Sequence, residues 1–297
     1  MSARAYTSGT QPSAAWRHCA PWAERLAVSL RAMGREVGGI TARHLDARLS
    51  AAAVPAELAE LADTLNGMLA RLEDSFRRLS NFSSDLAHEL RTPVSNLLTQ
   101  TQVTLSKSRT GDEYRDILAS NAEEFERLAR LVSDMLFLAK SENDLAMPSR
   151  EPISLADEVS SVLEFYEALA EEKGIVVTLV GQGTISGGRL MMRRAICNLV
   201  SNAVRHTSPG GTITVQILEH GRSWIELQLE NVGEGIPAEH FPRLFERFYR
   251  IDFARQRQSE GAGLGLEITK SIVRAHGGEA DVSSANGVTT FCLKFPA

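Results

Sequence analysis

The sequence predicts a two-part protein, an all-α dimeric four-helix bundle followed by an α+β sandwich. Two heptad patterns separated by a short polar turn predict one antiparallel helical hairpin per chain. After residue 152 the helical period gives way to alternating strands and separate helices, which predicts a mixed or antiparallel sheet with helices on one face. The length of 297 residues agrees with about two domains of roughly 150 residues.

Composition narrows the class of protein. Lys and Arg total 32 against 37 Asp and Glu, and a net charge of −5 argues against a nucleic-acid partner. The 3 cysteines are far apart in the sequence, which is typical of a reducing compartment without a disulfide framework. No run reaches the ~18 apolar residues of a membrane-spanning helix, so this sequence is expected to be cytoplasmic as given.

The first half of the chain is predicted to be helical from Met33 onward. Residues 1–32 show no clear period and receive no assignment, and the helix that begins at Met33 is expected to end near Ser50. Pro55 with Glu57 marks the start of a second helix. A long heptad seam follows, formed by Leu58, Leu61, Leu65, Leu69, Leu72, Phe76, Leu79, Ser83, Leu86 and Leu90. A seam of this length requires a partner helix.

A second seam completes the hairpin. Gly111 and Asp112 are expected to break the first pattern, and the rhythm resumes at Tyr114, Leu118, Asn121, Phe125, Leu128, Val132, Met135 and Ala139. One hairpin exposes its apolar stripe, so two hairpins are expected to pair as a homodimer. Residues 141–152 are polar and contain two prolines, which favours a linker.

The α+β part is expected to contain helices at 155–173, 190–205 and 266–276. Strands are predicted at 175–180, 212–218, 224–231 and 289–295, with an irregular Gly- and Arg-rich stretch at 233–265. In the second of these helices, a polar stripe (Asn198, Asn202, Arg205, His206) runs beside an apolar face (Met192, Ile196, Leu199, Ala203). Amide oxygens suit Mg²⁺, and Arg205 suits phosphates. An ordinary polar helix face is the alternative, although it would more often use Glu, Lys or Gln.

Strand parity singles out one asparagine. Ile225, Leu227 and Leu229 form the apolar side of their strand, and Asn231 continues that side, whereas Glu226, Gln228 and Glu230 point the other way. A buried amide needs a partner, and a purine edge is one candidate. A simple turn after an edge strand is the alternative.

Three glycines, Gly261, Gly263 and Gly265, precede the helix at 266–276. Such a segment is compatible with a phosphate cradle, but its spacing fits neither the dinucleotide fingerprint nor the P-loop. Glycine-rich turns are common, so an ordinary turn before the helix is the alternative.

His88 lies about 200° from the seam positions Leu86 and Leu90, so its ring is expected to face solvent. Thr92 lies one turn further on the same face, and Arg91 is three residues away. A neutral, exposed imidazole can act as a nucleophile. A structural histidine is the alternative.

Together these features resemble the sensor histidine kinases of bacterial two-component systems over residues 33–297. The segment from His88 to Pro93 looks like the H-box, NLVSNAVRHT like the N-box, NVGEG like G1, FPRLFERFYR like the F-box and GAGLGL like G2. The resemblance implies a HAMP-like segment (33–75), a dimerisation and phosphotransfer hairpin (76–140), a linker (141–152) and an ATP-binding domain of the GHKL or Bergerat type (153–297). It implies a response regulator receiver domain as partner.

The resemblance also implies residue roles. His88 would be phosphorylated by ATP, with Glu89 as orienting group or base, Arg91 nearby, and Thr92 positioning a water for dephosphorylation of the regulator. Asn202 would hold Mg²⁺. Phe245, Phe248 and Tyr249 would anchor a mobile lid, and Arg247 or Arg250 would approach the phosphate. The implied nucleotide site comprises Asn198, Asn202, Arg205, His206, Asn231, Gly233, Gly235, Ile236, Arg247, Gly261, Gly263, Leu264, Gly265 and Thr290.

This sequence departs from the family pattern in three places, one of which is the start of the HAMP-like segment, where the expected proline is missing. Asn231 replaces the G1 aspartate, and Gly188 stands where an acidic cap often precedes the N-box helix. Asn231 and the run IPAEHFPRLFERFYRID resemble the heavy-metal-sensing subgroup. The full-length protein is expected to be anchored in the bacterial inner membrane by helices outside this sequence. A nucleotide-switched ATPase and a degenerate dimeric scaffold remain as alternatives.

Overall fold

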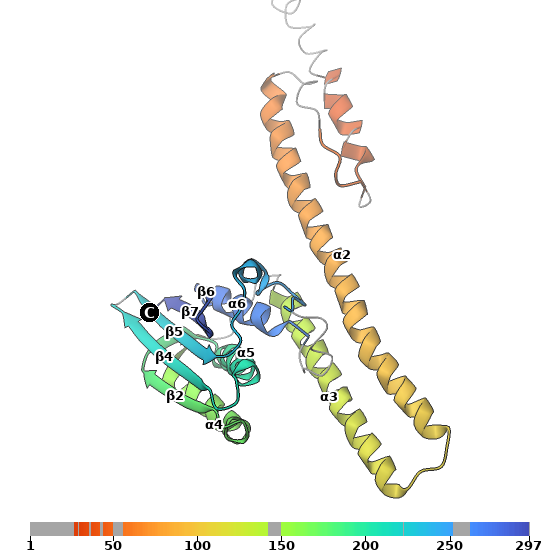
Figure 1. Cartoon of the computed structure of the whole chain (residues 1–297). Helices are drawn as coiled ribbons and strands as arrows, with labels where there is room; N and C mark the ends of the chain where they lie inside the picture. Colours follow the sequence, from red (N-terminus) through yellow and green to blue (C-terminus); the bar gives the residue numbers. More distant parts are fainter. Residues whose placement is uncertain are drawn as a thin grey trace, which may run out of the picture. The chain divides into compact units, whose positions relative to one another are not determined.

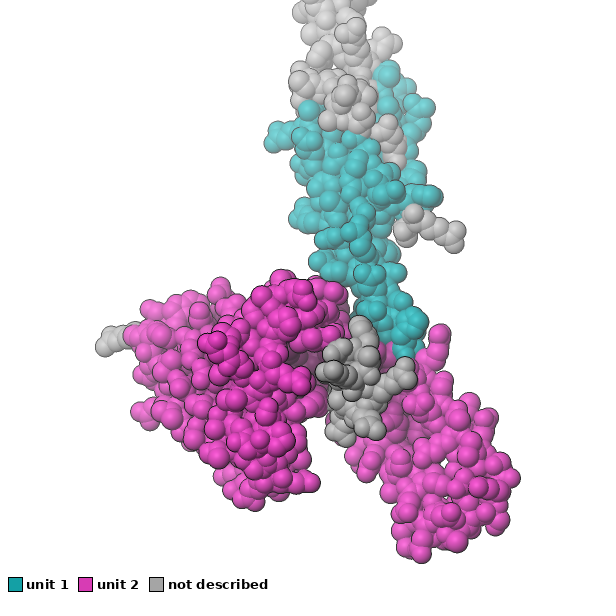
Figure 2. Space-filling model, in the orientation of Figure 1, with its two compact units in different colours: residues 1–88 teal, residues 89–297 magenta. Residues whose placement is uncertain are grey.

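The computed structural model describes residues 27–28, 30–35, 37–41, 44–49, 56–141, 150–221, 223–251 and 262–296. The chain divides into two compact units, residues 1–88 and 89–297, coloured teal and magenta in Figure 2. The boundary falls inside a single continuous helix, α2 (Ala56–Leu105), which is labelled in Figure 1.

The first helix ends earlier than the sequence predicts. Its last described helical residues are 37–39, and residues 40–41 and 44–49 have no regular secondary structure apart from a turn. Gly38 and Gly39 explain this end, because fixing two consecutive glycines in a helical conformation loses a large amount of backbone entropy. Ser50 and Pro55, which were expected to frame the next helix start, lie outside the described residues.

Within the first unit, the side-chain amide of Asn66 links the segment that contains Leu49 to α2. Asn66 accepts the Leu49 N–H at 2.9 Å and donates to the Leu49 carbonyl at 3.0 Å. Met33, Leu49 and Ala62 form a small buried cluster beside this bridge. The amide therefore pairs backbone groups that no helix or strand satisfies.

The hairpin turn lies at 106–110, before the predicted break. Gly111 and Asp112 are the first two residues of α3 (Gly111–Ser141) instead. The Glu113 carboxylate accepts the Thr110 N–H at 2.8 Å, and the Thr110 hydroxyl accepts the Glu113 N–H at 3.3 Å. This reciprocal capping box starts α3 and overrides the low helix propensity of Gly111.

The predicted linker is partly structured. Residues 142–149 lie outside the described residues, but Glu151 and Pro152 belong to β1 (Glu151–Ser154). This strand pairs antiparallel with β3 (Thr184–Gly187) in a two-stranded sheet. The sequence prediction missed both strands, because four residues are too few to show an alternation.

The larger sheet is mixed, as predicted, and has the strand order β2-β4-β5-β7-β6. β2 (Val176–Gly181) is parallel to β4 (Thr212–His220), and the other pairs are antiparallel. The remaining strands are β5 (Trp224–Val232), β6 (Glu279–Ala285), which the sequence prediction missed, and β7 (Val288–Pro296). A short 3₁₀ helix, η2 (Ala238–Arg243), interrupts the irregular stretch after β5.

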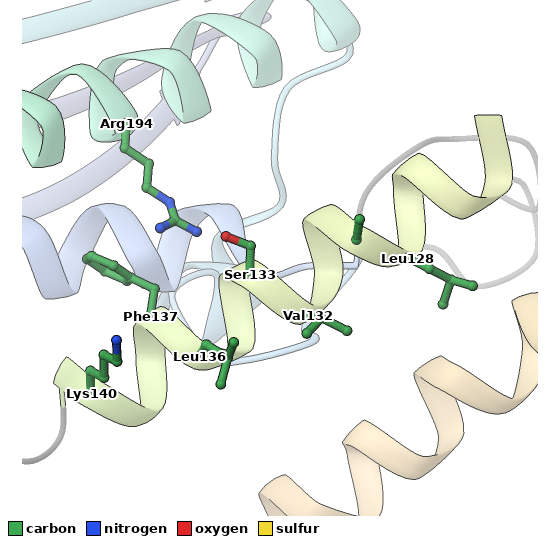
Figure 3. A pocket seen from close by; sticks show the side chains of 8 residues that line it. Leu128, Val132, Ser133, Leu136, Phe137, Lys140 and Arg194 are labelled. Carbon is green, nitrogen blue, oxygen red and sulfur yellow. The ribbon is translucent and has the colours of Figure 1, made fainter. Parts of the chain in front are cut away.

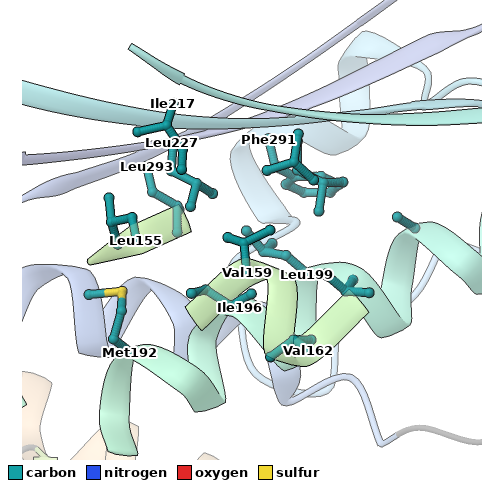
Figure 4. Close-up of a cluster of buried hydrophobic side chains, with 14 of the residues drawn as sticks. Leu155, Val159, Val162, Met192, Ile196, Leu199, Ile217, Leu227, Phe291 and Leu293 are labelled. Atoms are coloured by element: carbon teal, nitrogen blue, oxygen red, sulfur yellow. The ribbon is translucent and has the colours of Figure 1, made fainter. Parts of the chain in front are cut away.

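Three helices cover one face of this sheet, as predicted: α4 (Leu155–Glu172), α5 (Arg189–His206) and α6 (Gly265–Ala275). Figure 4 shows side chains of α4 and α5 directed at side chains from the sheet, with Ile196 and Leu199 opposite Leu227 and Phe291. All four side chains are at most 2% exposed. The sandwich therefore completes its apolar core within this chain.

Candidate nucleotide and phosphoacceptor sites

The candidate phosphoacceptor lies on α2 and is exposed, as the sequence predicts. Leu86 and Leu90 are partly buried, whereas the His88 side chain is open to solvent. Arg91 and Thr92 are also exposed, and Glu89 is half-buried. The α2 helix continues through Pro93 to Leu105, so the spacing of these residues is helical throughout.

The polar stripe of α5 lies beside its buried face, as predicted. Met192, Ile196, Leu199 and Ala203 are at most 1% exposed, Asn198 and Asn202 are half-buried, and Arg205 and His206 are exposed. The Asn198 Nδ2 donates to the Gly265 carbonyl at 3.1 Å, which brings α5 to the glycine segment. The Asn198 Oδ1 is an amide oxygen on this stripe and can serve as an acceptor.

A cationic environment surrounds His206. Desolvation lowers the pKa of this imidazole, and Arg205, Lys173 and Arg250 lower it further, while Glu234 opposes them. These effects favour the neutral ring, which offers one hydrogen-bond donor and one acceptor. The same cations give this end of α5 a positive potential, which suits a phosphate.

Asn231 ends the buried side of β5, as parity predicts. Its side chain is 4% exposed and shares its face with Ile225, Leu227 and Leu229. Asn231 is paired in register with Thr289 of β7, and Thr289 is 5% exposed. These two polar side chains lie at the same end of the apolar sandwich face.

Thr290, which was predicted to line a purine pocket, does not share a face of the sheet with Asn231. Thr290 is paired with Glu230 on the opposite face of the sheet, where its hydroxyl lies 3.4 Å from the Glu230 carboxylate. A shift of one residue moves a side chain to the other face of a sheet. Counting by twos from the apolar residues Phe291, Leu293 and Phe295 would have identified Thr289 from the sequence as the inward-facing threonine.

Thr289 also connects to the G1 loop. Its hydroxyl lies 3.0 Å from the Ser284 hydroxyl, which accepts the Ile236 N–H at 2.9 Å. Ser284 and Thr289 were both missed by the sequence prediction, because β6 was not recognised. The chain of contacts positions Ile236 beside the same end of the sheet as Asn231.

The two G1 glycines allow close backbone approach. A Cβ at Gly233 would lie 2.3 Å from the His206 carbonyl oxygen, so that position accepts no side chain without movement. Gly235 has a φ of 76°, in the left-handed region. Gly233 therefore allows the loop after β5 to approach the end of α5, and Gly235 provides the left-handed backbone conformation of this loop.

The glycine segment packs on the F-box region. The Phe248 N–H donates to the Gly263 carbonyl at 3.0 Å, and a Cβ at Gly263 would lie 2.9 Å from the Phe248 backbone. Leu264 is 1% exposed and caps α6, which begins at Gly265. Gly261, the first glycine of this segment, lies outside the described residues.

Aromatic residues anchor the loop that was expected to carry a lid. Phe245 is buried in the core, and Lys270 lies 5.0 Å above its ring. The Tyr249 hydroxyl lies 2.6 Å from His240 Nδ1, and the Arg247 Nε lies 3.9 Å from the Glu267 carboxylate. Arg247 is thus held next to α6, at the predicted nucleotide site.

A contact between α3 and α5 was not predicted. Arg194 forms a salt bridge with Asp134 and lies 4.4 Å above the Phe137 ring. Figure 3 shows Arg194 reaching from α5 over a groove of about 690 Å³ along α3. No local sequence signal identifies this contact, because its partners are 60 residues apart.

The fold and these residues define a class of protein, an ATPase-type sandwich preceded by a helical phosphoacceptor hairpin. Residues 187–297 match the model of "Histidine kinase-, DNA gyrase B-, and HSP90-like ATPase" domains. Residues 78–144 match "His Kinase A (phospho-acceptor) domain", and 29–74 match "Sensor protein PhoQ-like, HAMP domain". The chain belongs to the sensor histidine kinases.

Individual relatives agree with this family. The chain is 48% identical over 271 residues to sensor histidine kinase CusS of Escherichia coli K12, covering 90% of this chain and 56% of that protein. It is similar in structure to Acinetobacter baumannii histidine kinase AdeS (TM-score 0.60, 24% identity, 70% and 97% of the two chains). It is also similar to histidine kinase ThkA in its complex with response regulator protein TrrA (TM-score 0.60, 18% identity, 74% and 63%).

The chain thus spans about half the length of the curated relatives it matches. Across the described ranges, none of the helices combines the length and apolar character that a bilayer crossing requires.

Proposed function

We propose that this chain binds ATP in its sandwich domain and transfers the γ-phosphoryl group to His88. The observation that carries the proposal is the exposed imidazole on a helix that also carries an exposed Thr92. The second support is the contact of Asn198 on α5 with Gly265 at the start of α6, together with the nearly buried Asn231 at the end of β5.

Asn231 and Thr289 are proposed to receive the adenine. Both are nearly buried at one end of the sandwich, so each gains from a hydrogen-bonding partner that replaces water. Gly233 and Gly235 shape the adjacent loop, and Ile236 adds apolar surface to it. This pocket differs from the predicted one in that Thr289 takes the place of Thr290.

The proposed phosphate region lies along α5 and the start of α6. Arg205, His206, Arg247, Gly263 and Leu264 would surround the phosphates, and Gly261 is included from the resemblance alone. Amide oxygens fit a hard cation, so Asn202, with Asn198 nearby, would hold Mg²⁺, whose remaining ligands come from phosphates and water. When bound, Mg²⁺ neutralises charge on the transferring group.

The proposed reaction is an in-line displacement at the γ-phosphorus. An imidazole nitrogen of His88 forms the new P–N bond while the bond from phosphorus to the β,γ-bridging oxygen breaks, and ADP leaves. The second ring nitrogen loses its proton, for which Glu89 is the proposed orienting group or base. Arg91 is proposed to stabilise charge near the acceptor, and Thr92 to orient a water that dephosphorylates the partner.

The proposed partners are a second copy of the chain and the receiver domain of a response regulator. Exposed apolar side chains on α3 support the dimer, and ThkA, which shares the fold, is known in complex with a response regulator. We also propose four segments, with bounds at 33–75, 76–140, 141–152 and 153–297. The full-length protein is proposed to be anchored in the bacterial inner membrane and to belong to the heavy-metal-sensing subgroup.

Incubation with γ-labelled ATP and Mg²⁺ tests this function. The expected product is an acid-labile, base-stable label that is lost completely in His88→Ala. His220→Ala provides the control, because His220 is an exposed histidine on β4. Label that persists in His88→Ala would refute the acceptor. ATP hydrolysis without any protein label in the wild type would favour a nucleotide-switched ATPase, and failure to bind millimolar ATP would favour a scaffold.

A further inference from the structure

The helix that carries Asn198 and Asn202 begins with an unusual backbone contact. Gly188 is the N-cap of α5 and provides no side chain to cap it. Its own N–H donates to His276 Nε2 at 3.1 Å. His276 is the C-cap residue of α6 and is 5% exposed. A histidine from the far end of α6 therefore meets the start of α5.

The hydrogen bonds of His276 determine its protonation state. Its Nδ1 lies 2.7 Å from the Ile272 carbonyl oxygen, which can only accept, so Nδ1 carries the proton. Nε2 must then accept the Gly188 N–H through its lone pair. Both bonds are satisfied at once by the neutral ring with a proton on Nδ1. Burial independently lowers the pKa of this imidazole, which favours the same state.

The ring fits closely between neighbouring elements. A Cβ at Gly187 would lie 2.2 Å from the His276 ring, and Phe295 contacts the ring edge-on at 6.3 Å between centroids. A side chain at position 187 would therefore collide with the ring, and glycine allows the imidazole to approach the backbone there.

A second hydrogen bond joins the same two helices. Asn198 donates to the Gly265 carbonyl at the start of α6, whereas His276 accepts from the start of α5. Ten residues separate Gly188 from Asn198 and eleven separate Gly265 from His276, which corresponds to about 15 Å along each helix. The helices thus run antiparallel, with one tie at each end of their contact.

We propose that His276 is a positioning residue for nucleotide binding, which sets the register of α6 against α5. The tie at Gly188 keeps Gly265 opposite Asn198, and it holds the glycine segment next to the amide side chains that are proposed to bind phosphate and Mg²⁺. The inference rests on the nucleotide site proposed above. His276 itself lies at the other end of both helices and touches no nucleotide.

A matched pair of variants tests this role. Gln and Met have nearly equal length and volume, but Gln keeps an acceptor for the Gly188 N–H and Met does not. The measured quantity is the dissociation constant of a fluorescent ATP analogue in the presence of Mg²⁺. It is measured on the full chain, at a temperature at which circular dichroism shows that each variant is folded. We expect His276→Met to weaken binding at least tenfold and His276→Gln to remain within threefold of wild type.

A double-mutant cycle separates positioning from general stability. Asn198→Ala removes the second tie, so the effect of His276→Met on affinity is expected to shrink by at least threefold in that background. If His276→Met weakens binding by the same factor in the wild type and in the Asn198→Ala background, the inference is overturned. If His276→Met does not fold, His276→Asn replaces it, because its amide is one methylene too short to reach Gly188.

The outcomes distinguish the two proposals. If His276→Met, or His276→Asn in its place, binds the ATP analogue as tightly as the wild type, the positioning role is overturned. The proposed nucleotide site is not affected by that result. A wild-type chain that binds no ATP analogue would refute the nucleotide site itself.

Discussion

The hairpin and the sandwich solve the burial of apolar surface in different ways. The sandwich buries Ile196, Leu199 and Phe291 within one chain, each at most 2% exposed. In α3, Leu118, Phe125 and Leu136 remain 58–65% exposed. Because large contiguous apolar stripes are costly in water, the sandwich completes its core within one chain, whereas the hairpin leaves apolar side chains that the proposed homodimer would bury.

Their functional residues differ in the same way. His88, Arg91 and Thr92 lie within two turns of one helix, so the phosphoacceptor motif is local. The residues proposed to bind nucleotide come from α5, β5, β7 and α6, which are up to about 90 residues apart. The proposed phosphoacceptor motif therefore depends on helix geometry alone, whereas the proposed nucleotide site depends on tertiary packing.

The largest effect is expected from charges in the exposed seam. Leu118→Glu with Phe125→Glu places four carboxylates in a symmetric dimer, and we expect its dissociation constant to rise at least a thousandfold, about 4 kcal/mol. Sedimentation velocity measures the change, and Glu126→Gln, on an exposed side chain of the same helix, is the control. A double variant that stays dimeric would place the interface elsewhere.

A cavity in the sandwich is expected to act on folding without affecting the dimer. Ile196→Ala removes a side chain that is 1% exposed and should lower the free energy of unfolding by about 2–5 kcal/mol. Urea denaturation followed by circular dichroism measures this loss. Leu190→Ala on the same helix removes a side chain that is 80% exposed and should change stability by less than about 0.5 kcal/mol. Equal losses would contradict the assigned core.

The two adjacent threonines provide a finer test. Thr289→Val removes a hydroxyl from the face that carries Asn231, and we expect ATP affinity to fall about tenfold, or 1.4 kcal/mol. Thr290→Val makes the same chemical change on the opposite face and should leave affinity within twofold. Isothermal titration calorimetry compares them. The reverse ranking would show that the register of β7 does not determine the purine pocket.

Asn231→Asp restores the acidic residue that the family usually has in G1. An aspartate keeps an acceptor oxygen at the same place and adds charge, so ATP binding should be preserved or tightened. The same calorimetry measures the ATP affinity. Asn231→Leu, which has a similar size but no polar atoms in its side chain, is measured for comparison. Tenfold weaker binding by Asn231→Asp would mean that this side chain does not face the adenine amino group.

The smallest effect concerns pH. His276 has a pKa below 6.5 in the folded state, because burial disfavours its charged form and Arg150 adds to this effect. Its contribution to stability is therefore complete above about pH 6.5 and declines as the pH falls toward the folded pKa, by at most about 1.4 kcal/mol per pH unit. Chemical denaturation between pH 5 and 8 measures the slope.

His276→Gln should show a shallower slope over this range. His206, whose pKa is also lowered, contributes its own share, so His206→Gln is measured in parallel. An unchanged slope in His276→Gln would contradict the neutral, buried ring.

Helix and strand periodicity correctly predicted the features that depend on residues close together in the sequence. The solvent-facing position of His88, the buried face of α5 and the inward side of Asn231 all agree with the sequence prediction, since helix and strand periods follow from backbone geometry. Strands β1 and β3 were missed because they are short. The early end at Gly39 and the cap at Thr110 depend on single residues, which outweigh the apolar pattern around them.

The sequence by itself predicted the three helices of the sandwich, the strands β2, β4, β5 and β7, the buried faces of α5 and β5, and the resemblance to the family to which the chain belongs. The tertiary structure alone decided that Thr289 is paired with Asn231, that Asn198 meets Gly265 and that His276 meets Gly188. Each of these contacts joins residues 58–88 positions apart. Their choice depends on strand register and on how helices slide along one another, and no local period encodes either.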